Sequence, residues 1–248
     1  MGKRYNCGMS GHSKWATIKR AKSVSDVKRG LTFTKIGNAI TIAVKTSGGV
    51  TDINSNFKLR LAVEAARAAN MPKDNIGRAI QKAVGKDAGI VEEVLYEGFA
   101  PEGISVIIEA ATDNSLRTTS EIKSIFNKDG GNFGQPGSVA YQFEQKGEIV
   151  ISKEGKTLDV AFEIAAESGA EDVVDDVAGF VVYTKPSDLG RISRIIKEKG
   201  FSITQASLIR KPLVPLLIND PEKKEKVINF LQKLEDLDDV QKVYSNMA

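Results

Sequence analysis

The chain has 248 residues, of which 41% are hydrophobic and 27% are charged, so it is long enough to bury more than one core. It contains one cysteine and one histidine, which excludes an internal disulfide and a zinc site built from these residues. No apolar run approaches the roughly 18 to 20 residues that cross a bilayer, and no apolar stretch follows the charged first residues. We therefore expect a cytoplasmic protein without a membrane anchor or signal peptide.

Charge is distributed unevenly along the chain. The formal net charge is +3, yet residues 1–86 hold 17 of the 35 lysines and arginines and only 4 of the 32 acidic residues. The remainder of the chain is therefore acidic. A basic end of this kind favours a polyanionic partner.

The first elements predicted along the chain are helices. Residues 1–8 show no periodicity and precede a second possible start at Met9, so we interpret them as an extension. Between residues 28 and 86, apolar residues recur at steps of three and four, which predicts three amphipathic helices. Ser47-Gly48-Gly49 separates the first two helices, and Asn70 with Pro72 separates the second from the third.

Beyond residue 89 the apolar period becomes two, which predicts strands. Asp113 and Asn114 are placed to cap a helix that lies between two such strands, and a glycine-rich loop at 129–137 follows this helix. The alternating residues of the two strands are Ile104, Val106 and Ile108, then Val139, Tyr141 and Phe143.

Residues 147–210 predict the order strand, helix, strand, strand, helix, strand, which is the ferredoxin-like βαββαβ pattern. A strand at 214–218, a helix opened by Asp220 and Pro221, and a strand at 240–244 follow. These last pieces need partners in the sheet that begins near Tyr96. We therefore predict an α+β multidomain fold with a basic three-helix domain at 9–86, a discontinuous α+β domain at 87–145 plus 212–248, and an inserted ferredoxin-like domain at 146–211.

Several separated motifs resemble the YebC family in order and spacing. Those in the basic part are Gly11-His12-Ser13-Lys14-Trp15-Ala16, Lys28-Arg29-Gly30, Phe33-Thr34-Lys35 and Asn70-Met71-Pro72-Lys73-Asp74-Asn75-Ile76. Those in the acidic part include Tyr96-Glu97-Gly98, Thr112-Asp113-Asn114, Gly130-Gly131-Asn132, Gly169-Ala170-Glu171-Asp172 and Leu234-Glu235-Asp236. The resemblance runs from Met9 to the C-terminus and is far more specific than any single short motif.

This resemblance implies a three-domain layout and a role in gene expression. Members of the family are described as bacterial transcriptional regulators, as a mitochondrial translational activator of a cytochrome oxidase subunit, and as ribosome-associated factors that help translation through difficult sequences. One departure is visible, because Gly37-Asn38-Ala39 follows Ile36 where the family usually carries an Arg-Glu pair. A contact that depends on that arginine is not carried over to this chain.

The candidate nucleic-acid-binding residues are mostly cations of the basic domain. Seven phosphate contacts from residues 14–35 would give a salt slope of about −6 on duplex DNA or about −5 on single strands. Because lysine dominates, we expect attraction to the backbone more than reading of bases. The candidates are Lys14, Trp15, Lys19, Arg20, Lys22, Lys28, Arg29, Lys35, Arg60, Arg67, Arg78 and Lys82, with His12, Ser13, Arg117, Gly130, Gly131 and Asn132 as further candidates.

Most of these residues also have an ordinary structural interpretation. Trp15 can stack on a base or anchor the N-terminal arm to the helices, and the anchor is favoured. The cations of the second and third helices can pair with Glu64 and Asp74. Arg117 can bind a ligand or form an inter-domain salt bridge. The glycine-rich loop can offer N–H groups to phosphate, although a turn that needs positive φ is commoner.

The acidic part of the chain offers no convincing site. Its clusters at 167–176 and 235–239 lack the spacing of a calcium loop and are interpreted as solvated strand ends. Residues 155–157 end like a phosphate-binding loop, but Val150 occupies the place of the first glycine, so nucleotide binding is not predicted. We expect neither a metal nor a cofactor.

We predict a non-enzymatic, nucleic-acid-binding regulator of gene expression. One alternative is DNA-bound transcriptional regulation, and the other is association with RNA or the ribosome to support translation. A nuclease that uses paired carboxylates and a purely protein-binding role are the weaker hypotheses. No membrane or small-molecule partner is expected, and a monomer and a dimer fit equally.

Overall fold

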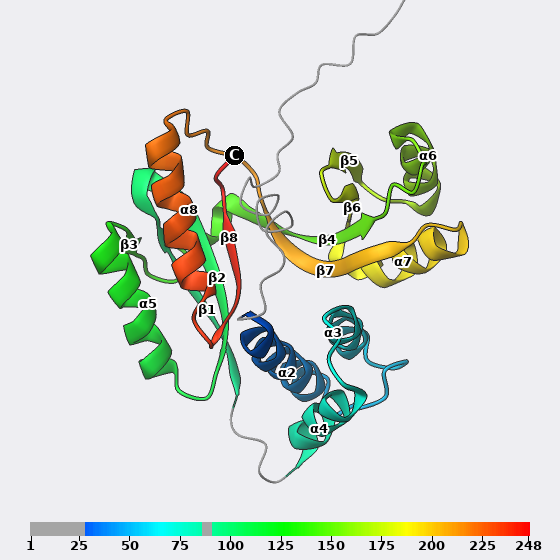
Figure 1. The fold of residues 1–248 in the computed structure, drawn as a ribbon, viewed down its shortest axis with the longest axis horizontal. Helices are drawn as coiled ribbons and strands as arrows, with labels where there is room; N and C mark the ends of the chain where they lie inside the picture. The colour runs from blue at the N-terminus through cyan, green and yellow to red at the C-terminus, as the bar shows by residue number, and fades with distance from the viewer. Residues whose placement is uncertain (1–27, 86–90) are drawn as a thin grey trace, which may run out of the picture.

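The computed structural model describes residues 28–85 and 91–248, with side chains from residue 32 onward. Its helices and strands form three units (Figure 1). We call them the helical unit, the first-sheet unit and the second-sheet unit. The arrangement is α+β, as predicted.

The helical unit contains α2 (Lys28–Thr46), α3 (Phe57–Ala68) and α4 (Lys73–Val84), which confirms the three helices expected from the apolar period. Asn56 caps α3, because its side chain accepts a hydrogen bond from the N–H of Leu59 at 3.0 Å and donates to the carbonyl of Ala43 at 2.9 Å. The Asn56 side chain therefore fixes the connection between α2 and α3 to the C-terminal part of α2. Apolar residues from the three helices form a common core.

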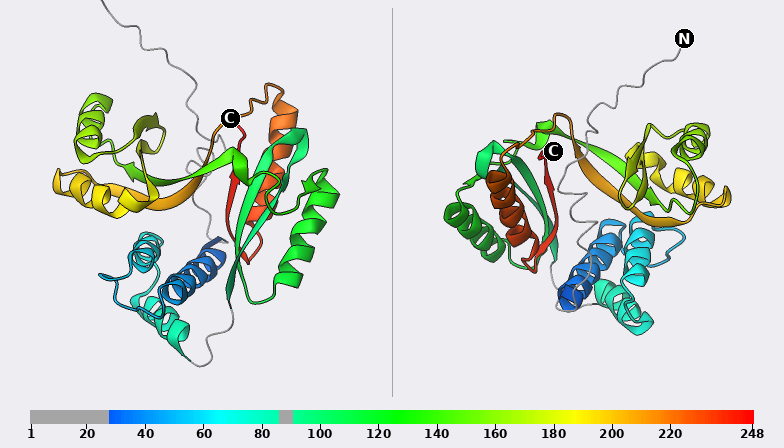
Figure 2. Two further views of the ribbon diagram at one scale, coloured as in Figure 1. Left: turned by 180° about the vertical axis from the view of Figure 1, so that it is seen from behind. Right: turned by 45° about the horizontal axis from the view of Figure 1, so that its top comes forward.

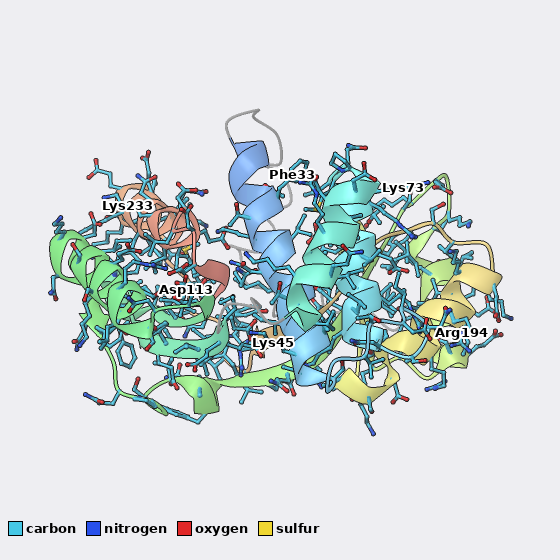
Figure 3. The ribbon with its side chains drawn as sticks, turned by 90° about the horizontal axis from the view of Figure 1, so that it is seen from below. Phe33, Lys45, Lys73, Asp113, Arg194 and Lys233 are labelled. Carbon is cyan, nitrogen blue, oxygen red and sulfur yellow. The ribbon has the colours of Figure 1, made fainter. Side chains whose placement is uncertain are left out.

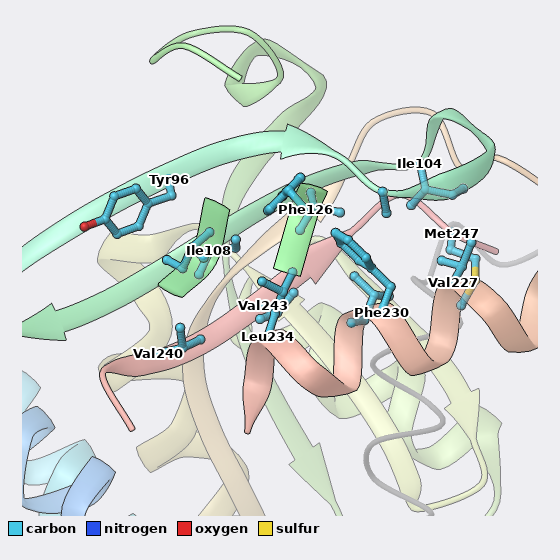
Figure 4. Close-up of a cluster of buried hydrophobic side chains, with 14 of the residues drawn as sticks. Tyr96, Ile104, Ile108, Phe126, Val227, Phe230, Leu234, Val240, Val243 and Met247 are labelled. Atoms are coloured by element: carbon cyan, nitrogen blue, oxygen red, sulfur yellow. The ribbon is translucent and has the colours of Figure 1, made fainter. Parts of the chain in front are cut away.

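The first-sheet unit has four antiparallel strands in the order β3-β1-β2-β8. The strands are β1 (Glu92–Phe99), β2 (Ser105–Thr112), β3 (Asn132–Phe133) and β8 (Val240–Ser245). α5 (Ser115–Asp129) and α8 (Pro221–Glu235) cover one face, where Phe126 and Phe230 pack edge to face at the centre of the core (Figure 4). Asp220 caps α8, as predicted.

The second-sheet unit lies between β3 and β8 in the sequence. It consists of β4 (Phe143–Ile151), α6 (Leu158–Ser168), β5 (Asp172–Asp176), β6 (Gly179–Thr184), α7 (Leu189–Glu198) and β7 (Ile203–Pro212). The strand order β5-β6-β4-β7 and the antiparallel pairing match the predicted ferredoxin-like pattern. α6 and α7 share one core with the sheet.

Two predicted strands are wrong. Ala140–Gln142 forms a short 3-10 helix, and β4 begins only at Phe143, because the N–H groups of Val139 and Ala140 bind the side chain of Glu97 and cannot join a ladder. The segment 214–218 has no strand beyond one bridge between Leu216 and Met247. Pro215 lacks an N–H group for pairing, and Val214 is 72% exposed.

The helical unit packs against both sheets, as two further views show (Figure 2). α2 contacts β2 and β8, whereas α3 contacts β7. Phe57 and Leu61 of α3 join the core of the second-sheet unit. A Cβ on Gly190 of α7 would lie 2.8 Å from the Phe57 ring, so α7 approaches α3 closely only because residue 190 has no side chain.

A polar contact joins the two sheet units. Nε of Arg210 on β7 donates to the Glu109 carboxylate on β2 at 2.8 Å, and the hydroxyl of Tyr244 on β8 donates to the same carboxylate at 3.2 Å. Burial, followed by the nearby negative charge of Glu109, raises the pKa of Tyr244 well above its usual value. Among the described helices, none combines the length and apolar character needed to span a membrane.

Candidate nucleic-acid interface

The helical unit keeps its cations at the surface. Residues 28–85 contain ten lysines and arginines and three acidic residues. Because the helices bury their apolar stripes against one another and against the two sheets, charged side chains remain on the outward faces. The excess of positive charge therefore lies at the surface of the helical unit and is not buried.

The exposed cations of α4 and of the last turn of α3 are Arg67, Lys73, Arg78 and Lys82, which we call the α4 basic face. Arg78 and Lys82 share one side of α4, and Lys73 lies on its other side. All four residues are exposed, and none makes an ion pair in the part of the chain that the structure describes. The guanidinium of Arg78 donates to the Asp74 carbonyl and to the Asn75 amide oxygen, both neutral acceptors. Its charge is therefore not neutralised, and the alternative in which these cations pair with Glu64 and Asp74 is matched by no ion pair among the described residues. Lys73 was not a candidate from the sequence.

Two other candidates make internal contacts. Lys35 on α2 donates to the backbone carbonyl of Glu235, in the last turn of α8, where a cation is favoured by the helix dipole. Arg60 on α3 donates to the carbonyls of Ile53 at 3.1 Å and Asn54 at 2.7 Å and so holds the connection before its own helix. Both side chains are half-buried as well, unlike that of Arg78, so we leave both residues out of the interface proposed below.

Several candidates lie outside the residues whose side chains are described. Lys28 and Arg29 begin α2, but only their backbone is described. The remaining candidates of the N-terminal part lie outside the described residues altogether; they are His12, Ser13, Lys14, Trp15, Lys19, Arg20 and Lys22. Binding by these residues stays a prediction from the sequence.

Arg117 belongs to a polar network within the first-sheet unit. Its guanidinium lies 2.8 Å from the Asp239 carboxylate and 2.9 Å from that of Asp113. The same Asp239 carboxylate accepts hydrogen bonds from the hydroxyls of Thr118 at 2.6 Å and Thr112 at 3.0 Å. Arg117 thus joins the start of α5 to the turn before β8, so its salt bridges lie inside one unit and do not cross between units.

The ionisation of this network follows from its contacts. Hydrogen bonds from Arg117 to Asp239 and Asp113 raise the pKa of Arg117 above its usual value. Burial raises the pKa of Asp239, but hydrogen bonds from Thr118, Arg117 and Thr112 outweigh burial and leave that pKa below its usual range. Both groups are therefore charged at neutral pH.

A small cleft brings Arg117 and Lys82 to the same place, although they come from different units. Its volume is about 190 Å³, and Asn38 and Thr41 of α2 also line it, together with Asp113 and Asp239. Asn38 belongs to the segment that departs from the family pattern. Both carboxylates pair with Arg117, whereas Lys82 makes no ion pair with a described residue.

The glycine-rich loop holds an internal anion. The carboxylate of Glu97, which is 4% exposed, accepts hydrogen bonds from the N–H groups of Gly137 at 2.7 Å, Val139 at 2.8 Å and Ala140 at 2.8 Å. Burial raises the pKa of Glu97, but these three bonds together outweigh it and leave the pKa below its usual range. Glu97 was not a candidate site residue, although it falls within a family motif.

The glycines of the loop have the structural roles that were favoured. Gly130 ends α5 with φ of 78°, and the N–H of Gly131 donates to the Phe126 carbonyl at 2.9 Å. A Cβ on Gly131 would lie 2.9 Å from the rings of Phe126 and Phe230, while Asn132 pairs with Phe99 in the sheet. The backbone N–H group of Gly131 is thus used within the fold, and phosphate binding by Gly130, Gly131 and Asn132 stays a prediction.

The chain matches known proteins over nearly its full length. Residues 13–86 match the model of the TACO1/YebC protein N-terminal domain, and residues 91–247 match that of the TACO1/YebC second and third domain. A probable transcriptional regulatory protein of Persephonella marina is 46% identical over 240 residues, which cover 96% of this chain and 95% of that protein. A probable transcriptional regulatory protein of Desulfitobacterium hafniense is 42% identical over 241 residues, with the same coverage.

A solved structure has the same fold. The crystal structure of a conserved hypothetical protein, Aq1575, from Aquifex aeolicus superposes with a TM-score of 0.87 at 41% identity and covers 95% of this chain and 97% of that one. The family models together span both sheet units and the helical unit, so the resemblance noted in the sequence is confirmed. This chain belongs to the TACO1/YebC family.

Proposed function

We propose that this protein is a non-enzymatic regulator of transcription that binds the phosphate backbone of DNA through its helical unit. The observation that carries the proposal is the α4 basic face, because Arg67, Lys73, Arg78 and Lys82 are exposed and have no acidic partner among the described residues. Unneutralised cations of this kind release counterions when they meet phosphates. The names of the curated relatives support the regulatory role.

The α4 basic face favours backbone contact over base reading. Asn75, a side chain suited to adenine, accepts a hydrogen bond from Arg78 within its own helix. Lysines supply half of the face and interact with phosphate as point charges. We therefore infer binding with low intrinsic sequence preference, in which further selectivity comes from DNA shape or from another protein.

Binding of RNA or the ribosome is the second candidate, and the same feature favours it. A surface that contacts backbone phosphates serves RNA as readily as DNA, because it does not depend on the pattern of base edges in the major groove. Support of translation therefore remains the alternative to transcriptional regulation. The two are separated by competition between duplex DNA, hairpin RNA and ribosomes.

The test measures the affinity of the full-length protein for a duplex of random sequence over a range of salt concentrations. The variant Lys73→Ala/Lys82→Ala removes two cations of the α4 basic face, and we expect the salt slope to fall by about two units in magnitude. The matched control is Lys128→Ala/Lys226→Ala, which removes from α5 and α8 two exposed cations that make no ion pair with a described residue. Equal slopes for the two double variants would refute the proposed interface.

The alternative has its own outcome in the same experiment. Ribosome cosedimentation that resists moderate salt, with DNA binding displaced by nonspecific competitor, would assign the protein to translation. Unchanged regulation in cells carrying Lys73→Ala/Lys82→Ala would favour a protein-binding role, because loss of phosphate contacts should impair any nucleic-acid binding by this face.

A further inference from the structure

Most cations of the second-sheet unit are neutralised by neighbouring acidic residues. The acidic residues of the cluster at 167–176, interpreted above as solvated strand ends, supply many of these partners. The ion pairs, with N to O distances between 2.5 and 3.7 Å, are Lys146 with Glu144 and Glu171, Lys153 with Asp175, Arg191 with Asp188, Lys199 with Glu167, Arg210 with Glu109, and Lys211 with Asp172. Lys156 donates to the Gly200 carbonyl and lies over the Phe201 ring.

Three cations of this unit differ from the others. Lys185, Arg194 and Lys197 are exposed, and none has an acidic partner in the part of the chain that the structure describes. All three fall in one segment, at or just before α7, although the unit is rich in carboxylates that pair with cations elsewhere. Their shared location makes this segment the one part of the described second-sheet unit where exposed cations lack an ion pair.

The unpaired cations of α7 lie on the face that meets the helical unit. Gly190, Arg194 and Lys197 follow one another at steps of four and three, so they share one face of α7. Gly190 is the residue that a Cβ would bring to 2.8 Å from the Phe57 ring of α3. Arg194 and Lys197 therefore lie on the same face of α7 as the contact with α3, one and two turns further along the helix.

α3 carries an exposed cation next in sequence to the residue that makes this contact. Lys58 directly follows Phe57, is exposed, and has no acidic partner among the described residues. We call Lys58, Arg194 and Lys197 the α3–α7 seam. α3 lies between α4 and α7 (Figure 1), and Lys73 and Arg194 lie on the same half of the molecule, opposite Lys233 and Asp113 (Figure 3).

We propose that the α3–α7 seam is a second contact for the phosphate backbone of the duplex that the α4 basic face binds. This inference rests on the proposed function and extends it to the second-sheet unit, where every other cation except Lys156 makes an ion pair. Duplex DNA carries a negative charge per roughly 1.7 Å of its axis, so a rigid duplex seated on α4 presents further phosphates to a neighbouring basic segment. The seam joins two units, so a duplex bound there spans both.

The test compares two double variants of the full-length protein on the same duplex of random sequence, of about 25 base pairs, a length that offers phosphates beyond the α4 basic face. Arg194→Ala/Lys197→Ala removes the α7 cations of the seam, and Lys128→Ala/Lys226→Ala removes the same charge from α5 and α8. All four side chains are exposed, so thermal unfolding should be unchanged in both variants. We expect the seam variant to lose about two units of salt slope and roughly tenfold or more in affinity near 0.1 M salt, while the control retains both.

Each other outcome has a distinct meaning. If the unmodified protein binds the duplex and the seam variant shows the same slope and affinity, the seam proposal is refuted and the α4 basic face stands. If the seam variant loses affinity for a hairpin RNA probe but not for the duplex, the assignment to DNA is refuted. If the unmodified protein binds neither probe, the proposed function fails and the seam proposal fails with it.

Discussion

Replacement of Glu97 by glutamine tests whether one buried carboxylate holds the glycine-rich loop. One oxygen accepts the N–H of Gly137, and the other accepts those of Val139 and Ala140. A glutamine amide has one oxygen in place of two, so at least one of these N–H groups loses its acceptor and faces an NH₂ group. A hydrogen bond to a charged group contributes about 1.5 to 3 kcal/mol, and we expect the loop to lose about 2 to 3 kcal/mol of local stability.

Amide hydrogen exchange measures this loss directly at the three N–H groups. A loss of 2 to 3 kcal/mol corresponds to exchange about 30 to 150 times faster at Gly137, Val139 or Ala140 in Glu97→Gln. Glu93→Gln is the control, because Glu93 lies on the same strand but is exposed. Unchanged protection of all three amides would refute the role assigned to Glu97.

The lowered pKa of Glu97 predicts that the local stability of the loop depends on pH. Because the pKa of Glu97 is lowered in the folded protein, its contribution to stability is complete above the pKa of the unfolded chain. The contribution is lost as the pH falls through the lower pKa of the folded state. Exchange at the three amides, corrected for its intrinsic pH dependence, should therefore accelerate in acid in the unmodified protein. In Glu97→Gln this acidic phase should be missing.

Further predictions concern stability and binding. Gly37→Ala should raise the free energy of unfolding by about 0.5 to 1 kcal/mol, because the residue lies within α2 and a Cβ there meets nothing within 4 Å. Gly190→Ala should instead lower it, because the new Cβ would displace the Phe57 ring; denaturant unfolding of the two variants should shift in opposite directions. Asp239→Asn should lower the thermal midpoint, because Arg117 loses its partly buried charged partner; an unchanged midpoint would contradict this. An increase in salt from 50 to 200 mM should weaken DNA binding by about 100-fold through the four cations of the α4 basic face alone, whereas a change of duplex sequence should matter far less.

Elements with a strong local signal were predictable from the sequence. The three helices of the helical unit follow from the apolar period, and α8 follows from Asp220 and Pro221. The ferredoxin-like order was also predictable, because its strands and helices alternate within one continuous segment. Division of the chain into domains by residue number stays a prediction.

The wrong strand at 139–143 depends on a partner that is distant in the sequence, whereas Pro215 within 214–218 was a local signal against a strand there. Val139 and Phe143 are buried, which gave the period of two, but Tyr141 between them is 72% exposed. The segment is held by Glu97, about forty residues earlier, and nothing in the local pattern reveals that acceptor.

The internal contacts of the cations likewise could not be predicted from the sequence. Lys35 and Arg60 looked like binding residues, yet Lys35 meets Glu235 at the far end of the chain and Arg60 meets carbonyls that carry no sequence signal. Conversely, Arg194 and Lys197 are exposed cations that were not candidates, because they lie in an acidic part of the chain. Only the fold distinguishes a cation that is half-buried and held by an internal contact from one that stays exposed and available.

The hydrogen bonds of Glu97 to the end of the glycine-rich loop limit how this protein can bind a polyanion. A loop of backbone N–H groups is a site where phosphate could be held in fixed geometry, but here an internal carboxylate takes three such groups at the end of the loop, those of Gly137, Val139 and Ala140. Attraction to nucleic acid then depends on flexible side-chain cations, which tolerate many backbone positions and discriminate poorly between sequences. Contacts divided between the α4 basic face and the α3–α7 seam would compensate in another way, because a duplex must match the distance and direction between two units that pack against each other. Selectivity would therefore come from the shape and stiffness of the DNA and not from its bases.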